Sequence, residues 1–405
     1  MRTRYGISPW IDTFPQQRRP DFPRLRGEHT ADVVIMGGGL TGCATAYACA
    51  VAGMRPVVLE ADRIGQGGVG RSAGLLLPDP GVSFRATAKA HGLRAARRIF
   101  EAWRKASLDA AATLRRLNVR CDLTPCDDVL VAIRESEKDL RKERDARVEA
   151  GIDAPWITAQ SARQSSALEV TGGIKLGSGF TLDPYRACHG VAAGAVERGA
   201  MPYERTAVKK LRVGRTHVDV IVDGGVVHTD TIIVTTGLAT AEFKPLRRHF
   251  KRRDSYLVLT EPLPAAMRRQ LGDPDLTIRD TASPRHRMRW TKDGRVLIAG
   301  ADGDEAPARQ RDSVLVQRTG QLMYEFLTMY PAISGLQPEY GWDMPYGETV
   351  DGIMYIGPHR NYPRHLFALG GSSDSVTGAF LAARILARAA RGEQDTADKV
   401  FGWTR

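Results

Sequence analysis

At residues 31–42 the chain reads ADVVIMGGGLTG, and the rest of the sequence is best interpreted outward from this stretch. Residues 31–36 are mostly apolar and β-branched, which is typical of a buried strand. The glycines follow as a turn, and the small apolar residues up to Ala52 predict a helix that Gly53 ends. A second strand at 55–60 closes on Glu60, 18 positions beyond Gly42. Strand, glycine turn, helix, strand and acid together indicate a dinucleotide-binding unit.

Each key position in this unit has a physical reason. Gly37 allows the tight turn, Gly39 lets a pyrophosphate approach the backbone, and Gly42 lets the helix pack close to the strand. Free N–H groups at the helix N-terminus favour phosphate. Glu60 accepts hydrogen bonds from both hydroxyls of an adenosine ribose and would repel a 2′-phosphate, which argues against NADP. The alternative is a glycine-rich turn in an ordinary doubly wound sheet. The unit alone does not separate FAD from NAD.

The 405 residues are 42% hydrophobic and 26% charged, which is ordinary for a globular protein and enough for two domains. No apolar run reaches the roughly 18 residues of a membrane span, and the first ten residues lack the apolar core of a signal peptide. We therefore expect a cytoplasmic protein without a membrane span. Cys121 and Cys126 have no second pair to complete a metal site, and the nine histidines show no ligand spacing, so we expect no metal.

The formal net charge is +12. Such a surface can attract nucleic acid or anionic lipid, but it also suits an anionic cofactor and acidic substrates. The densest basic run is RRHFKRR at 247–253, which we expect to be a solvated loop. Nucleic acid is therefore not an expected partner, and the sequence does not indicate an oligomeric state.

Two further glycine segments extend the pattern. Residues 64–74 hold five glycines in eleven positions, together with Arg71 and Ser72, and are either a linker or, as we favour, a second cofactor loop. At 366–390 a strand, the turn GGSS at 370–373 and a helix repeat the logic of the first unit. Between them we expect a buried strand at 231–237, a helix at 87–117 with an apolar stripe, and an exposed charged helix at 136–149.

Blocks spread over nearly the whole chain follow one order: SPW at 8–10, the glycine turn, LEA at 59–61, RSAG at 71–74, DP at 183–184, YE at 203–204, TEPL at 260–263, DGR at 293–295 and GGS at 370–372. In this order they resemble the FAD-dependent D-amino-acid oxidase superfamily, and most closely its branch of glycine, sarcosine and γ-glutamylputrescine oxidases.

The resemblance implies an α/β fold, in which a Rossmann-like FAD-binding domain carries an inserted mixed, mainly antiparallel β-sheet substrate domain. We expect the FAD-binding domain in residues 1–88, 155–240 and 340–405, and the substrate-binding domain in 89–154 and 241–339. The expected cofactor is non-covalent FAD, because no cysteine follows Cys188 and Arg71 stands where covalent relatives have a histidine. The predicted cofactor-binding residues are Gly37, Gly39, Leu40, Thr41, Gly42, Glu60, Ala61, Gly67, Gly68, Arg71, Ser72, Ala73, Gly74, Val208, Thr236, Gly237, Asp351, Gly370, Gly371, Ser372, Ser373, Val376 and Thr377.

Two residues are predicted to take part in catalysis, Arg289 and Asp374. At 373–375 the chain reads Ser-Asp-Ser where the family usually has Gly-His-Gly, and Asp374 would oppose reduction of the flavin unless it points away or caps the following helix. In the predicted strand at 285–290, alternation places three arginines on one face. Arg289 is the predicted holder of a substrate carboxylate. The alternative is an exposed cationic strand face.

The resemblance therefore implies an enzyme, an FAD-dependent oxidoreductase that oxidises the C–N bond of a small amine or amino acid. A hydride passes to flavin N5, the product is an imine, and an oxidase would also release H₂O₂. Two alternatives stay open. One is a flavin dehydrogenase that passes electrons to a quinone or a partner protein, and the other is a protein of this fold that acts on RNA.

Overall fold

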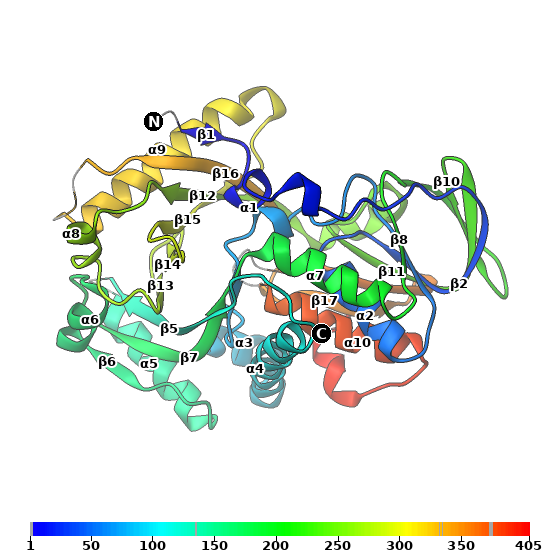
Figure 1. Cartoon of the computed structure of the whole chain (residues 1–405). Helices are drawn as coiled ribbons and strands as arrows, with labels where there is room; N and C mark the ends of the chain where they lie inside the picture. The colour runs from blue at the N-terminus through cyan, green and yellow to red at the C-terminus, as the bar shows by residue number, and fades with distance from the viewer. Residues whose placement is uncertain (1–2, 134–135, 332, 334, 372–375) are drawn as a thin grey trace.

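A computed structural model of the chain describes residues 3–133, 136–331, 333, 335–371 and 376–405. In these residues the strands form a sheet of eight strands and a sheet of ten, with helices packed around both. In Figure 1 the ten-stranded sheet lies on the left and the eight-stranded sheet on the right. None of the helices in the described ranges is long and apolar enough to cross a membrane.

The eight-stranded sheet carries the glycine turn. Its main path runs β17–β18–β11–β2–β3–β8, and all neighbours from β18 to β8 are parallel. Strands β9 and β10 continue from β11 as an antiparallel meander. The bounds are Gly27–Met36 (β2), Pro56–Leu59 (β3), Met201–Tyr203 (β8), Val208–Val213 (β9), Val218–Val222 (β10), Gly225–Gly237 (β11), Tyr355–His359 (β17) and Tyr362–Leu369 (β18).

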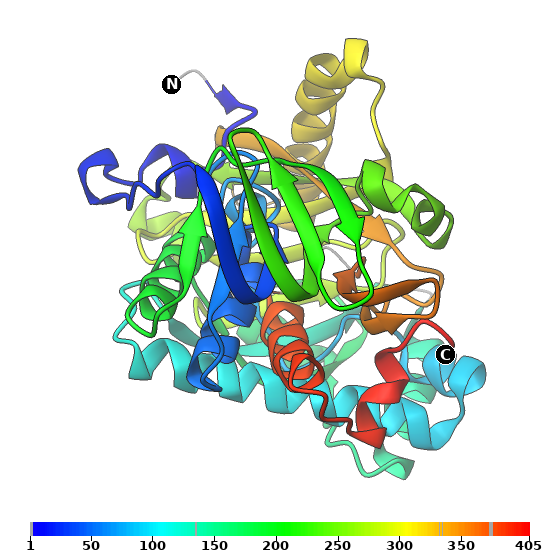
Figure 2. The same ribbon diagram turned by 90° about the vertical axis from the view of Figure 1, so that its right-hand side faces the viewer.

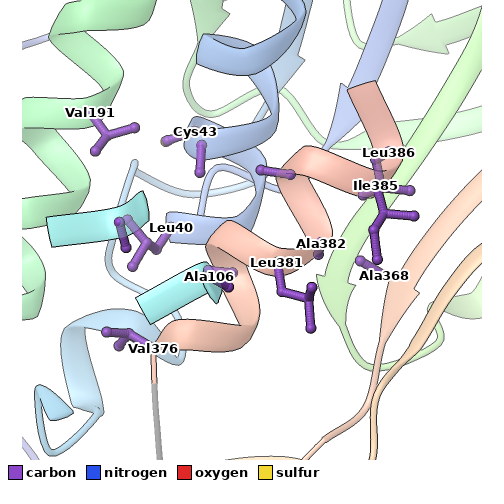
Figure 3. Close-up of a cluster of buried hydrophobic side chains, with 14 of the residues drawn as sticks. Leu40, Cys43, Ala106, Val191, Ala368, Val376, Leu381, Ala382, Ile385 and Leu386 are labelled. Carbon is purple, nitrogen blue, oxygen red and sulfur yellow. The ribbon is translucent and has the colours of Figure 1, made fainter. Parts of the chain in front are cut away.

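Alternation along the parallel strands sends side chains into two cores. Val33 and Ile35 pack in one core with helices α2 (Leu40–Val51), α7 (Pro184–Val196) and α10 (Thr377–Ala390), part of which Figure 3 shows. Val34 and Met36 pack in the other core with residues of β10 and β11. The result is three layers: helices, parallel sheet and meander. In Figure 2 the meander (green) faces the viewer, with α2 and α10 below it.

The ten-stranded sheet is mixed and mainly antiparallel. Its main path runs β1–β16–β12–β15–β14–β13–β5–β7–β4, with β6 paired to β7. Within the described residues, only the β1–β16 and β13–β5 pairs are parallel. The bounds are Arg4–Tyr5 (β1), Leu75–Leu76 (β4), Thr124–Ala132 (β5), Trp156–Thr158 (β6), Gly172–Thr181 (β7), Lys251–Thr260 (β12), Leu276–Asp280 (β13), Arg287–Trp290 (β14), Val296–Asp304 (β15) and Pro338–Glu348 (β16).

The remaining helices lie around and between the sheets. Helix α9 packs on β12, β15 and β16, whereas α5 and α6 pack on β7. The α-helices are Pro9–Asp12 (α1), Phe84–His91 (α3), Leu93–Arg116 (α4), Glu137–Glu149 (α5), Ala159–Ser166 (α6), Ala265–Arg268 (α8) and Arg311–Met329 (α9). Short 3₁₀ segments are Gln16–Arg18 (η1), Val69–Arg71 (η2), Ala241–His249 (η4), Ala308–Gln310 (η5) and Thr396–Phe401 (η6).

Two element predictions need correction. The helix expected at 87–117 is divided into α3 and α4 by Gly92, whose φ of +85° is a conformation that glycine adopts readily and other residues rarely do. Helix α5, expected to be exposed, buries Leu140, Glu143 and Arg147. Glu143 and Arg147 pair with each other within the helix at 2.9 Å, and the sequence pattern does not show that both also have partners outside it. Arg147 forms an ion pair with Asp79 at 2.6 Å.

The expected fold class is confirmed: a Rossmann-like parallel sheet is combined with a mixed, mainly antiparallel sheet. However, the strands of each sheet do not all fall within the residue ranges that were expected for one domain. Strands β7 and β16 fall in ranges assigned to the FAD-binding domain but lie in the ten-stranded sheet. Helix α4 falls in a range assigned to the substrate-binding domain but packs on α10. The division into domains by residue ranges stays a prediction.

Candidate cofactor and active site

A cavity of about 640 Å³ lies where the carboxyl ends of β2, β3 and β11 meet the first turns of α2 and α10. Open parallel sheets bind their ligands at this edge, and the volume is within the range of ligand pockets. The predicted residues that line it are Gly37, Gly39, Leu40, Thr41, Glu60, Ala61, Gly67, Gly68, Ser72, Val208, Thr236, Gly237, Gly370, Gly371 and Val376.

Different structural constraints favour glycine at the different positions of the first turn. Gly37 has a φ of +106°. A Cβ at Gly42 would overlap the Gly37 carbonyl oxygen, so helix α2 can leave the strand this closely only without a side chain there. A Cβ at Gly39 would meet nothing within 4 Å, although the residue lines the cavity. Gly38 was not among the predicted residues, but a Cβ there would overlap Ile64.

Glu60 is held in place by two backbone groups. The Gly38 N–H donates to its Oε2 at 2.6 Å, and the Asp62 N–H donates to its Oε1 at 2.8 Å. Burial raises the pKa of Glu60, and these two N–H groups oppose that shift. A fixed carboxylate on the wall of the cavity is what recognition of a ribose diol requires, since each oxygen still has a free lone pair.

The glycine-rich loop at 64–74 is held by the N-terminal segment and by β16. Ser8 Oγ donates to the Gly70 carbonyl, and Trp10 Nε1 donates to the Ser72 carbonyl at 3.0 Å. From β16, Trp342 Nε1 donates to the Arg71 carbonyl at 2.7 Å. These three bonds fix the backbone of the loop, which argues against the alternative of a flexible linker and agrees with the favoured interpretation as a second cofactor loop.

Several predicted cofactor residues lie behind the cavity wall. The Arg71 guanidinium forms an ion pair with Asp343 at 3.0 Å. Ala73 packs with Trp10 and Leu75, and a Cβ at Gly74 would overlap the Leu182 carbonyl. Thr377 Oγ1 donates to the Leu77 carbonyl at 2.8 Å. Through these contacts, Arg71, Ala73, Gly74 and Thr377 support the cavity wall from behind, as Gly42 does, and they do not line the cavity.

The second glycine turn closes the opposite side of the cavity. Gly370 and Gly371 have φ values of +74° and +124°. A Cβ at Gly370 would lie 2.7 Å from both Phe250 and Thr349, so both side chains pack against this backbone. The predicted residues Ser372, Ser373 and Asp374 lie outside the described residues.

Asp351 is paired away from the cavity. Its carboxylate accepts from the Arg405 guanidinium at 2.8 Å and from the Ile353 N–H at 3.0 Å. Burial acts to raise its pKa, but Arg405 outweighs burial and the pKa is lowered. Its contacts join the C-terminus to the segment before β17.

The arginines of β14 are buried, so the strand is not an exposed cationic face. Arg289 donates to the Leu182 carbonyl at 3.1 Å and lies over the Trp10 ring at 5.1 Å. Burial lowers its pKa to about 10. Arg289 is not among the residues that line the large cavity.

Arg287, two residues earlier on the same strand, connects to that cavity. It donates to Ser255 Oγ at 2.9 Å and to Asp302 Oδ1 at 3.0 Å. The hydroxyl of Tyr346 donates to the other oxygen of Asp302 at 3.4 Å, and Tyr346 lines the cavity. Sequence reasoning missed Asp302 and Tyr346, because only the pairing of β12, β15 and β16 brings them together.

The basic run at 247–253 is partly neutralised. Lys251 and Arg253 form ion pairs with Asp304 at 2.9 and 2.6 Å, and Arg252 forms one with Glu305 at 2.7 Å. The run is not the expected loop, because it forms the end of η4 and the start of β12, but the ion pairs of its lysine and arginines support the interpretation as solvated surface. Whether nucleic acid binds stays untested.

The sequence profile of the family described as "DAO: FAD dependent oxidoreductase" matches residues 32–389. The chain belongs to this family. FAD is therefore its cofactor, and the expected enzyme class, a flavin-dependent oxidoreductase, is confirmed at that level.

Among DAO-family relatives, gamma-glutamylputrescine oxidoreductase of Escherichia coli is 26% identical over 93% of this chain and 87% of its own length. Glycine oxidase of Bacillus licheniformis is 24% identical over 89% of this chain and 95% of its own. In structure, glycine oxidase from Geobacillus kaustophilus superposes with a TM-score of 0.74, at 19% identity, over 93% of this chain and 99% of that one.

The residues present fit FAD. Gly39 leaves open space on the cavity wall beside the N-terminus of α2, where a pyrophosphate is stabilised by free N–H groups. Glu60 presents its carboxylate on the same wall. The five cysteines are buried and none lines the cavity, which supports the prediction that FAD is non-covalent.

Proposed function

We propose that this protein oxidises the C–N bond of a small amine or amino acid. The observation that carries the proposal is the single cavity lined by both glycine turns and by Tyr346, whose hydroxyl donates to Asp302 of the Asp302–Arg287 ion pair. The similarity to a gamma-glutamylputrescine oxidoreductase and to glycine oxidases supports amines as the substrate class.

The proposed division of labour follows from the positions of the residues. The turn at 37–42 and the α2 N-terminus hold the pyrophosphate, Glu60 holds the ribose, and the turn at 370–371 lies at the other end. When bound, FAD would supply the acceptor for the hydride that leaves the carbon next to the substrate nitrogen. The protein positions the substrate and keeps water out of the cavity.

We propose Arg287, rather than Arg289, as the arginine that helps to orient the substrate. Arg287 reaches the cavity wall through Asp302 and Tyr346, whereas Arg289 faces Leu182 and Trp10. Arg287 and Asp302 neutralise each other, and neither is among the residues that line the cavity, so the pair would act on the substrate by positioning Tyr346. Arg287→Lys is expected to raise KM with a smaller change in kcat, and Arg289→Lys to weaken FAD retention instead.

The deciding experiment is anaerobic bleaching of the bound flavin. A panel of amino acids, N-methyl amines and polyamine conjugates is compared with sn-glycerol 3-phosphate, since relatives of 28% identity over 58% of this chain are anaerobic glycerol-3-phosphate dehydrogenase subunits. Bleaching by at least one amine is expected. Bleaching by glycerol 3-phosphate alone, or protein that stays colourless after incubation with FAD, would contradict the proposal.

A second candidate is a dehydrogenase that does not use oxygen. A cleft of about 870 Å³ lies behind the second glycine turn, lined by Phe250 and Thr349, which pack against Gly370, and by Arg248 and Lys251. Such a cleft offers an electron acceptor a place close to the turn. Peroxide formed in proportion to the amine consumed in air supports the oxidase, whereas turnover only with an added quinone or dye supports the dehydrogenase.

A further inference from the structure

A group of polar side chains on the outer face of the meander takes no part in the flavin site. His217 precedes β10, Asp219 lies on β10, and His228 lies on β11. Each offers one ligand atom, and these atoms all lie within 4.8 Å of one another. The spacing of the histidines along the sequence does not reveal this group, because its members come together through strand pairing.

The register of the strands brings the three side chains together. Asp219 and His228 are directly opposed in the antiparallel pair, and His217 is two residues before Asp219 and so on the same face. Their neighbours Val218 and Val227 point the other way and are fully buried. The ladder of paired strands thus holds Asp219 and His228, and His217 directly precedes β10, so two of the three ligands have a more rigid support than a loop provides.

Each of the two imidazoles turns one ring nitrogen towards Asp219 and the other towards a second polar group. His228 Nδ1 and His217 Nε2 approach the same Asp219 oxygen, at 2.8 and 3.2 Å. The outer nitrogens are engaged elsewhere: His228 Nε2 with Glu28 Oε1 at 2.8 Å, and His217 Nδ1 with Thr216 Oγ1 at 3.1 Å. Histidines that bind metals commonly donate their other nitrogen to a carboxylate or another polar group in this way.

We propose that His217, Asp219 and His228 form a binding site for a divalent transition-metal ion of the Zn²⁺ class, with Glu28 as the group that orients His228. Two imidazole nitrogens and one carboxylate oxygen suit Zn²⁺ and leave a fourth position for water. Mg²⁺ and Ca²⁺ prefer oxygen ligands only and are not expected to bind here. Arg212 opposes Asp219 on β9, and its positive charge would repel a bound metal ion.

The site is expected to be structural. Glu28 lies at the start of β2 and the cofactor turn follows its end, so about 30 Å of strand separates them at ~3.3 Å per residue. Binding of the metal should therefore stabilise the meander and leave FAD content and amine turnover unchanged. This expectation is independent of the proposed function.

The test is equilibrium dialysis of the full-length, FAD-loaded protein, prepared without a histidine tag, against buffered Zn²⁺, with bound zinc measured by elemental analysis. One saturable Zn²⁺ per chain is expected, together with no uptake of Mg²⁺. His217→Ala and His228→Ala should each weaken binding at least tenfold, and Glu28→Gln should weaken it less. Bound Zn²⁺ should raise the melting temperature of the natural chain but not that of His228→Ala.

His29 provides the matched control. It neighbours Glu28 on β2, and its ring contacts Tyr203 outside the group, so His29→Ala should bind Zn²⁺ as the natural chain does. All of these variants lie on the surface, so loss of folding does not obscure the result. The proposal would be overturned if the natural chain took up no saturable Zn²⁺, or if His217→Ala and His228→Ala took up as much Zn²⁺ as the natural chain. A loss in His29→Ala as large as in those two variants would also overturn it.

Discussion

Two glycines of one turn should respond differently to the same substitution. Gly42→Ala places a methyl group against the Gly37 carbonyl, so both the stability of the apoprotein and its affinity for FAD should fall. Gly39→Ala meets no protein atom, and its φ of −73° suits alanine, so the apoprotein should keep its melting temperature while FAD binding weakens. Thermal unfolding of the apoproteins and FAD titration measure the two effects. Equal behaviour of the two variants would contradict this interpretation of the turn.

Glu60→Gln tests recognition of the ribose. The amide replaces one carboxylate oxygen by a donor that faces either the Gly38 or the Asp62 N–H. Hydrogen bonds to a charged group contribute about 1.5–3 kcal/mol, so FAD affinity should fall about 10- to 100-fold. Asp62→Asn is the control, because it keeps the backbone N–H that contacts Glu60 and removes only a nearby like charge, which should not weaken FAD binding. An unchanged dissociation constant, measured by flavin fluorescence, would exclude Glu60 from the site.

His189 should make the protein less stable in mild acid. Its ring is buried between Phe14 and Tyr185, and burial, with a smaller effect of Arg19, lowers its pKa to about 4. The unfolded chain, with a pKa near 6.5, binds more protons between these values, so the free energy of unfolding falls as pH drops from about 6.5 to 4. The slope is at most about 1.4 kcal/mol per pH unit. His189→Phe should flatten it in urea unfolding; an unchanged slope would place its origin elsewhere.

His286 should make the protein less stable as the pH rises into the alkaline range. Burial acts to lower its pKa, but Asp280 at 2.6 Å and Glu325 at 2.9 Å outweigh burial and raise the pKa to about 9. The folded state therefore holds the proton more tightly, and the stability it contributes is complete below about pH 6.5 and is lost as pH rises towards 9. His286→Gln should remove that alkaline decline in urea unfolding. A decline that persists unchanged in the variant would argue against this pair of contacts.

At the scale of elements, strand β16 supports the glycine-rich loop. Trp342 is fully buried, and its Nε1 donates to the Arg71 carbonyl. Trp342→Phe leaves that carbonyl without its partner, which costs about 1–3 kcal/mol, and the loosened loop should release FAD faster. Trp156→Phe on the distant strand β6 is the control. Equal FAD dissociation rates in both variants would show that the loop does not depend on this bond.

The element predictions succeeded where the pattern is local. The strand, turn and helix at 31–52 follow from β-branched residues, glycines and small apolar residues that are neighbours in sequence. Helix α5 was located correctly, but its exposure was predicted wrongly. Nothing local distinguishes a charged side chain in water from one paired in the interior, and Glu143 and Arg147 find their partners around Asp79 and the start of α3.

At the scale of the molecule, a buried network of charges joins helix α5 to the ten-stranded sheet. Asp79 accepts from Arg147 at 2.6 Å and from Arg279 at 3.2 Å, and Arg279 also contacts Asp128. Burial acts to raise the pKa of Asp79, but the two arginines outweigh it and lower the pKa to about 2. Its contribution is therefore present above about pH 3.8 and is lost as pH falls towards 2.

Asp79→Asn should consequently destabilise the whole protein. It removes one of the two carboxylates that each buried guanidinium group contacts, while Arg147 keeps Glu143 and Arg279 keeps Asp128. Removal of one partner of a buried ion pair typically costs about 3–5 kcal/mol, and the remaining carboxylates should hold the loss at or below this range. Asp127→Asn is the matched control, since the Asp127–Lys175 pair on the same side of the molecule is 42% and 40% exposed and should contribute at most about 1 kcal/mol. Chemical denaturation compares the two variants. A loss in Asp79→Asn no larger than that in Asp127→Asn would show that the network is not cooperative.

The sequence by itself determined the fold class and led to the prediction of where the adenosine end of the cofactor site lies. The glycines, the helix start and Glu60 all fall within 24 residues, from Gly37 to Glu60, and their roles depend on short-range sterics and on spacing along a strand and a helix. The same reasoning extends to the second turn at Gly370, because it repeats the local pattern.

Only the tertiary structure decided which charged residues meet. Arg71 pairs with Asp343 across 272 residues of sequence, and Arg287 rather than Arg289 connects to the cavity wall. His217, Asp219 and His228 form a group only in the register that β10 and β11 adopt. Side chains from distant segments meet through the order and pairing of strands, and a salt bridge or a ligand set depends on those distances rather than on spacing in the sequence.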